Sequence, residues 1–148
     1  MTAVRFINAR GTARYGRYRL VPTEGTDHLS AEAAAAKSAD YLLDEIATRT
    51  ERQPVTFRVL AQLANDGDVV DNATIHWPED RTLMELGNVT LTTLVPDSAE
   101  EQRTIIFDPI PRVDGIEPSA DPLLELRAAI YLLSGRRRRA AGSTAASA

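Results

Sequence analysis

The stretch TIIFDPIPRVDGIEPSADPLLELRAAIYLLSGRRRR, residues 104–139, joins an extended run, a proline-rich crossing segment and a capped helix. Pro122 stands at a favoured first helical position, and Asp121 before it is a typical N-cap residue. The sequence therefore predicts a helix that begins at Pro122 and runs to about Ser134. Its side chains are nearly all apolar, which indicates a helix buried on most sides.

Two polar residues share one face of this helix. Arg127 and Tyr131 are four residues apart, and Arg138 returns to the same stripe if the helix continues. The pKa of a free tyrosine is about 10, and a fixed cation nearby favours the phenolate form that binds iron. Tyrosine is a known haem ligand, and arginine suits a propionate. The spacing alone is a weak signal, because core tyrosines bonded to a carbonyl more commonly explain it.

The order of the surrounding motifs strengthens this signal. The segment contains, in order, Phe107-Asp108-Pro109, Gly115-Ile116-Glu117-x-Ser119-x-Asp121, Arg127-x-x-x-Tyr131 and a basic run at 136–139. This order resembles the proximal haem-binding segment of haem catalases. It is most similar to the small, minimal catalases that also act as peroxidases.

The resemblance implies roles for five residues around a haem b cofactor. Tyr131 would be the proximal iron ligand and therefore the metal-binding residue. Arg127 would tune that tyrosine, and Asp121 would help to hold Arg127. Phe107 would touch the haem, and Arg138 would meet a propionate.

The beginning of the chain is expected to form a hairpin. Two β-rich runs, residues 4–9 and 13–21, flank the turn-forming Arg10-Gly11. They resemble the F-V-N-A-x-G hairpin in the middle of the eight-stranded catalase barrel. The resemblance implies that the family's distal His and Asn have no counterpart here, and that a further family histidine aligns with Thr2. We expect no catalytic role for His28, in a turn-rich link, or for His76, before Trp77.

The remaining segments complete the predicted fold. Residues 55–64 and 84–95 are expected to be strands, and residues 30–50 have a helical composition with a restart near Ser38. The prediction is an α+β fold: four antiparallel strands forming the second half of a catalase-like β-barrel, a helical insertion and a C-terminal haem-proximal helix. One domain is expected over residues 1–139, with a disordered tail at 140–148.

Composition limits the other classes of function. The chain has 148 residues, a net charge of −4 and no cysteine. The charge argues against nonspecific nucleic-acid binding, and a disulfide framework or a thiolate metal site is excluded. The acidic loop at 65–68 lacks the calcium-binding pattern. No signal peptide or membrane-length apolar run is visible, so a cytoplasmic location is expected.

By resemblance, the chain is expected to be a haem-dependent oxidoreductase that decomposes hydrogen peroxide or uses hydrogen or organic peroxides as a peroxidase. Because the distal half is absent, the isolated chain is expected to be weak or inactive. Half a barrel leaves two unpaired edges, so we expect a homo-oligomer or a second chain that supplies the distal half. A non-catalytic haem-binding protein and an inactive catalase-fold fragment with a structural role are the alternatives.

Overall fold

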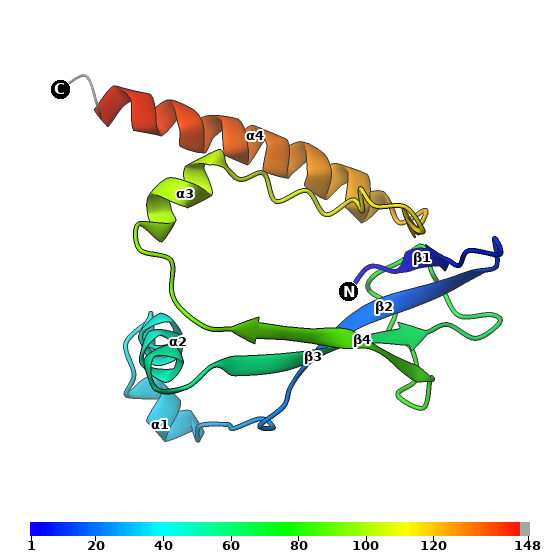
Figure 1. Ribbon diagram of the computed structural model, residues 1–148, viewed down its shortest axis with the longest axis horizontal. Coiled ribbons are helices and arrows are strands. Elements are labelled where there is room, and N and C mark those ends of the chain that lie inside the picture. Colours follow the sequence, from blue (N-terminus) through cyan, green and yellow to red (C-terminus); the bar gives the residue numbers. More distant parts are fainter. Residues whose placement is uncertain (146–148) are drawn as a thin grey trace. The chain divides into compact units, whose positions relative to one another are not determined.

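The computed structural model describes residues 1–145, which contain five strands and four helices (Figure 1). These elements are, in chain order, β1 (Val4–Ile7), β2 (Ala13–Pro22), α1 (Ala31–Ala35), α2 (Tyr41–Arg52), β3 (Val55–Leu63), β4 (Leu83–Leu91), α3 (Ser98–Thr104), β5 (Ile116–Pro118) and α4 (Pro122–Ala145). The strands form one antiparallel sheet in the order β4-β3-β2-β1-β5. The α+β prediction is confirmed: all four expected strands are present, in an open sheet with β4 and β5 at its edges.

The expected hairpin is formed by β1 and β2. Val4 pairs with Gly16, and Ile7 pairs with Ala13. The Asn8 side chain closes the turn, because its Oδ1 accepts hydrogen bonds from the backbone N–H groups of residues 10 and 12 at 2.9 and 3.0 Å. The turn expected at Arg10-Gly11 is therefore present, and the Asn8 side chain, which the sequence analysis did not single out, closes it.

Strand β5 was not predicted. Its three residues pair with β1, with Ile116 opposite Phe6. A strand this short has no alternation long enough to be recognised. Gly115 allows the chain before β5 to come close to the end of β1: its φ is 81°, and a Cβ there would lie 2.9 Å from the carbonyl oxygen of Ile7. The strand depends on a tertiary contact rather than on local propensity.

The described residues fall into two compact units. Unit 1 comprises residues 1–18, 61–84 and 97–145, and unit 2 comprises residues 19–60 and 85–96. The single domain expected over residues 1–139 contains both. The buried apolar residues that form the core of unit 1 are Ala3, Val4, Ala61, Leu63, Trp77 and Leu124.

Unit 2 contains the helical insertion, and the prediction of two helices there is confirmed. Ser30 caps α1, since its Oγ accepts a hydrogen bond from the backbone N–H of Ala33 at 3.2 Å. Helix α2 begins after Asp40 and ends at Arg52. The small residues and cap formers between the two helices interrupt what would otherwise be one helix.

Helix α4 begins where the sequence predicts. Asp121 is its N-cap, and Asp121 Oδ1 accepts a hydrogen bond from the backbone N–H of Leu123 at 3.0 Å. The helix continues past the expected end near Ser134, because arginine and alanine are strong helix formers. Of the tail expected from residue 140, residues 140–145 continue α4, and residues 146–148 lie outside the described residues.

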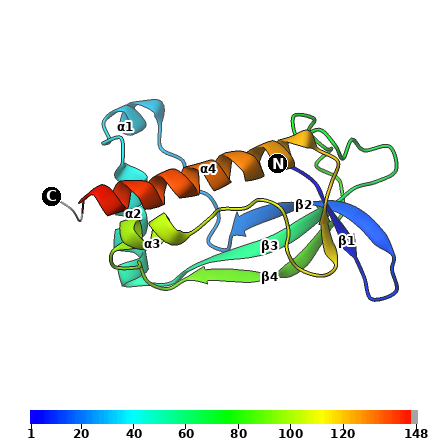
Figure 2. The same cartoon turned by 90° about the horizontal axis from the view of Figure 1, so that it is seen from above.

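The expectation that this helix is buried on most sides is wrong. Leu124 is its only buried large apolar side chain in the part of the chain described here, whereas Leu126, Ile130 and Leu133 are 56, 51 and 56% exposed. The contacts of α4 are concentrated on one side, where α3 and the segment after it lie (Figure 2). An apolar helix needs a surface to pack against, but its own sequence does not show whether the rest of the chain provides one.

None of the helices within residues 1–145 has the length and apolar character that a membrane span requires.

Candidate functional site

The polar stripe of α4 has the geometry that the sequence predicts for its first pair. Arg127 Nη2 donates a hydrogen bond to the Tyr131 hydroxyl at 3.0 Å, and the Arg127 Cζ lies 5.4 Å from the Tyr131 ring centroid. Arg127 is exposed and Tyr131 is half-buried. The guanidinium therefore sets a positive charge against the phenol oxygen of a half-buried tyrosine.

Arg138 occupies the C-terminal part of the stripe and joins three parts of unit 1. Its Nε donates to the carbonyl of Gln102 at 3.0 Å, and its Nη2 donates to the carbonyl of Ile105 at 2.7 Å. Its Nη1 donates to Ser134 Oγ at 2.7 Å. An arginine has five N–H donors, so these three bonds leave two without a partner among the described residues. Arg138 can hold the protein and still bind an anion.

Phe107 is brought to the same end of α4. The Arg138 Cζ lies 5.4 Å from the Phe107 ring centroid, and Phe107 is 48% exposed. A cation over an aromatic face is a favourable contact. Of the five residues implied by the resemblance, the structure thus brings Phe107 to Arg138 and Arg127 to Tyr131.

The turn after Phe107 is fixed by Asp108. Asp108 Oδ1 accepts a hydrogen bond from the Ile110 backbone N–H at 3.0 Å, and Oδ2 accepts two from Arg112 at 3.0 and 2.8 Å. The Ile110 N–H, and secondarily the Arg112 guanidinium, lower the pKa of the Asp108 carboxyl. The carboxylate therefore stabilises the turn that follows the aromatic ring.

Asp121 has a different position from the one its implied role suggests. It is 3% exposed, and no hydrogen bond or ion pair joins it to Arg127 among the described residues. Residues six apart on a helix point to different sides. Asp121 Oδ2 is buried and has no hydrogen-bond partner within residues 1–145. A buried acceptor normally has a donor, so this oxygen is available to a group from elsewhere. The role of Asp121 toward Arg127 stays a prediction.

Sequence reasoning missed the residues that anchor Arg138. Ser134 lies four residues before Arg138, which is a helical spacing that can be recognised in the sequence. The carbonyls of Gln102 and Ile105 carry no such signal, because backbone acceptors are the same in every residue. Both histidines, His28 and His76, are exposed. No group of three His, Cys, Asp or Glu side chains suited to a metal ion occurs in the part of the chain that the structure describes.

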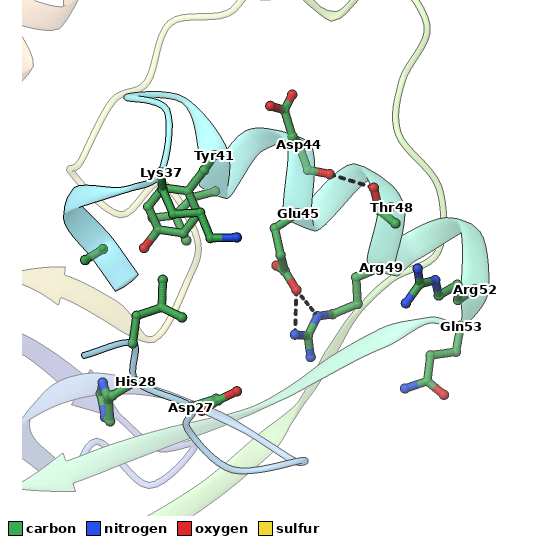
Figure 3. Close-up of a pocket in the computed structure, with 13 residues that line it drawn as sticks. Asp27, His28, Lys37, Tyr41, Asp44, Glu45, Thr48, Arg49, Arg52 and Gln53 are labelled. Atoms are coloured by element: carbon green, nitrogen blue, oxygen red, sulfur yellow. Dashed lines mark hydrogen bonds and ion pairs between the residues drawn. The ribbon is translucent and has the colours of Figure 1, made fainter. Parts of the chain in front are cut away.

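A separate open depression lies in unit 2, with a volume of about 1180 Å³ (Figure 3). Residues 27–29, α1 and α2 line it, and its charged groups have both signs. Glu45 forms an ion pair with Arg49, and Arg49 also lies 3.7 Å from Glu24. Because these charges pair with one another, the depression presents no single sign of charge to a ligand. None of the five site residues lines it.

Comparisons with known proteins show the family to which this chain belongs. The sequence profile of the family described as Catalase matches residues 1–145. A catalase-related peroxidase of Synechococcus elongatus is 36% identical over 136 residues, which are 92% of this chain and 40% of that protein. A catalase-related peroxidase of Mycolicibacterium paratuberculosis is 39% identical over 138 residues, 92% of this chain and 43% of that protein.

The solved structure of catalase A from Saccharomyces cerevisiae is similar in fold, with a TM-score of 0.79 at 22% identity, over 93% of this chain and 30% of that chain. The chain thus spans about two fifths of the length of the curated peroxidases it matches. The profile match over residues 1–145 decides the family: this chain belongs to the catalase family.

Proposed function

We propose that this chain supplies the proximal side of a haem site for catalase or peroxidase chemistry, with Tyr131 as the iron ligand. The observation that carries the proposal is the 3.0 Å hydrogen bond from Arg127 to the Tyr131 hydroxyl. A phenol oxygen with a guanidinium beside it, partly open to solvent, fits a ferric ion, because the cation offsets the charge of a metal-bound phenolate. The catalase family in general depends on haem, which further supports a haem cofactor. We propose haem b as its form.

The other site residues fit the same group. Phe107 offers an exposed aromatic surface, and Arg138 offers two N–H donors to a propionate. Bound haem would supply the redox-active iron on which a peroxide is broken down. The chain's own contribution is to hold the ligand oxygen with Tyr131 and Arg127 and to bind the carboxylate edge with Arg138.

Proton transfer to and from a peroxide requires a titratable group within hydrogen-bond reach. Neither histidine of the printed sequence lies on the α4 stripe, and both are exposed. We therefore assign the distal acid and base to residues outside the printed sequence, in the same polypeptide or in a second chain. Hydrogen peroxide or an organic peroxide would be the substrate, as the names of the related peroxidases suggest. A cytoplasmic location stays a prediction.

Haem binding without turnover is the second candidate function. The Arg127–Tyr131 hydrogen bond favours it equally, since the site residues of this chain form only the proximal side of a haem site. A purely structural catalase-fold fragment is the third possibility and predicts no haem uptake. Titration with haemin separates these functions from each other.

The experiment is an optical titration of the purified chain with haemin, followed by an assay of peroxide breakdown. We expect a Soret band of ferric tyrosinate type that is lost in Tyr131→Phe. Tyr41→Phe, the same chemical change on helix α2, is the matched control and should bind haemin like the native chain.

Identical spectra of Tyr131→Phe and the native chain would contradict Tyr131 as ligand. A Soret band with no peroxide breakdown would favour haem binding alone. No band in any of the three proteins would leave the structural role.

A further inference from the structure

Gly135 is buried in the interior of α4, which is an unfavourable place for glycine. Its neighbours in the helix are good helix formers, and alanine would fit the helical backbone better. A Cβ at this position, however, would lie 3.1 Å from Ile106 Cγ1 and 3.8 Å from Arg138 Nη2. The missing side chain therefore gives Ile106 a place against the helix.

We propose that Gly135, Ser134 and Arg138 form a dock that fixes the segment 102–107 on α4 and so positions Phe107. Ile106 fills the space above Gly135. Just before that contact along the chain, Arg138 binds the backbone carbonyls of Gln102 and Ile105. Ser134 accepts a hydrogen bond from the same guanidinium and orients it.

These contacts fix three successive parts of the segment. The carbonyl of Gln102 belongs to the last turn of α3, where helical carbonyls lack partners within their own helix. Ile105 and Ile106 follow directly, and Phe107 comes next. Because Ile106 and the Ile105 carbonyl are both held, the backbone has little freedom to move the Phe107 ring away from Arg138.

The dock determines where an aromatic ring from a connecting segment meets the stripe of α4. Arg127, Tyr131 and Arg138 share a face because of helical spacing alone. Phe107 has no such constraint, since it precedes Tyr131 by 24 residues and lies outside any helix or strand. Gly135 and Ser134 are thus positioning residues for Phe107. The contact of Phe107 with haem rests on the proposed function, whereas the dock itself does not.

The test is to fill the space above Gly135 and then to reopen it. Gly135→Ala and Gly135→Val add one and three carbons toward Ile106. Ile106→Ala in the Gly135→Val background removes the side chain that the valine meets. Ile105→Ala in that background is the matched control, because Ile105 is 42% exposed and is absent from the atoms nearest Gly135.

The first readout uses the chain without haem. Hydrogen exchange of the Arg138 Nε–H, followed by NMR, reports its bond to the Gln102 carbonyl. We expect exchange about tenfold faster in Gly135→Val, the size of effect of one lost hydrogen bond, and a smaller acceleration in Gly135→Ala. Slow exchange should return with Ile106→Ala and not with Ile105→Ala.

The second readout is haemin affinity. In Gly135→Val we expect weaker binding, by about tenfold, with the tyrosinate-type spectrum retained, and recovery on addition of Ile106→Ala. If the native chain binds no haemin, the proposed function fails while the exchange measurement still decides the dock.

Unchanged exchange in Gly135→Ala and Gly135→Val would overturn the dock, and so would equal rescue by both isoleucine variants. Should Gly135→Val fail to fold, Gly135→Ala and Ser134→Ala carry the same measurement. Ser134→Ala removes the acceptor of Arg138 Nη1 and should accelerate exchange of the Arg138 Nε–H severalfold. Native-like exchange of the Arg138 Nε–H in both Gly135→Ala and Ser134→Ala would overturn the proposal.

Discussion

Two of the arginine–aromatic pairs in unit 1, Arg17–Trp77 and Arg127–Tyr131, differ in burial and in hydrogen bonding. Arg17 lies 4.1 Å above the Trp77 ring, both residues are 5% exposed, and the guanidinium donates to the carbonyls of Val69, Asn72 and Ile75. Arg127 lies 5.4 Å from the Tyr131 ring, is exposed, and donates to the phenol oxygen.

The Arg17–Trp77 pair holds segments of the protein together. The Arg127–Tyr131 pair instead leaves the phenol oxygen and N–H donors of the guanidinium accessible to a ligand. A buried cation must be compensated by fixed acceptors, and here those acceptors are the carbonyls of the 69–75 loop. The Trp77 Nε1–H donates to the Val69 carbonyl at 2.7 Å, so ring and guanidinium hold the same loop. We therefore expect the two pairs to respond oppositely to substitution: the first through stability, the second through ligand binding.

The largest effect is expected from Trp77→Ala. Loss of a buried tryptophan typically costs about 3–5 kcal/mol, and here the Arg17 guanidinium also loses its aromatic partner. Urea unfolding followed by circular dichroism measures the change, since Trp77 is the chain's only tryptophan. Tyr131→Phe is the comparison and should stay within about 1 kcal/mol of the native chain. Equal losses in the two variants would abolish the distinction between the pairs.

A pH dependence is expected beside the first pair. Hydrogen bonds from Arg81 at 2.8 and 3.0 Å, and then the Asn65 backbone N–H, lower the pKa of Asp68 from 3.8 to about 2. A lowered folded-state pKa stabilises the protein fully above the unfolded value of 3.8, and this contribution is lost as the pH falls toward 2.

The measurement is the urea midpoint of the native chain and of Asp68→Asn between pH 6 and pH 2.5. The native chain should be the more stable at pH 6, and the gap should narrow below about pH 4. Other carboxyls, among them Asp108, contribute the same pH dependence of the unfolding free energy to both proteins. A gap that is constant with pH would show that the Asp68–Arg81 pair does not titrate with folding.

The smallest effect on stability is expected from Arg127→Ala. An exposed guanidinium contributes about 0–1 kcal/mol, so the urea midpoint should hardly move. The haemin spectrum should nevertheless change, because the phenol oxygen loses its cation, while Arg127→Lys should retain part of the native spectrum. A stability loss as large as that of Trp77→Ala would make the second pair structural like the first.

Local sequence signals predicted the elements that depend on local chemistry. The cap at Asp121 and the turn at Arg10-Gly11 each arise within a few residues, and both were found where expected, as was the strand expected at residues 55–64. The Arg127–Tyr131 contact was predicted for the same reason, because two residues four apart on a helix must meet.

The features that the sequence did not reveal depend on contacts between distant residues. Strand β5 exists because Gly115 lets the chain approach Ile7. The burial of α4 was overestimated because apolar residues indicate a need for a partner and not its presence. The half-buried, ion-paired state of Asp68 was also missed, since Arg81 lies 13 residues later in an irregular segment.

The sequence by itself thus determined the family, the helix that holds Tyr131 and the stripe on which Arg127 and Arg138 lie, because helical periodicity and motif order are local properties. Only the tertiary structure decided how Phe107 reaches Arg138, why position 135 is a glycine, and which cation is buried and which is exposed. These features are set by packing and by backbone acceptors from distant segments, which no short pattern of residue types specifies.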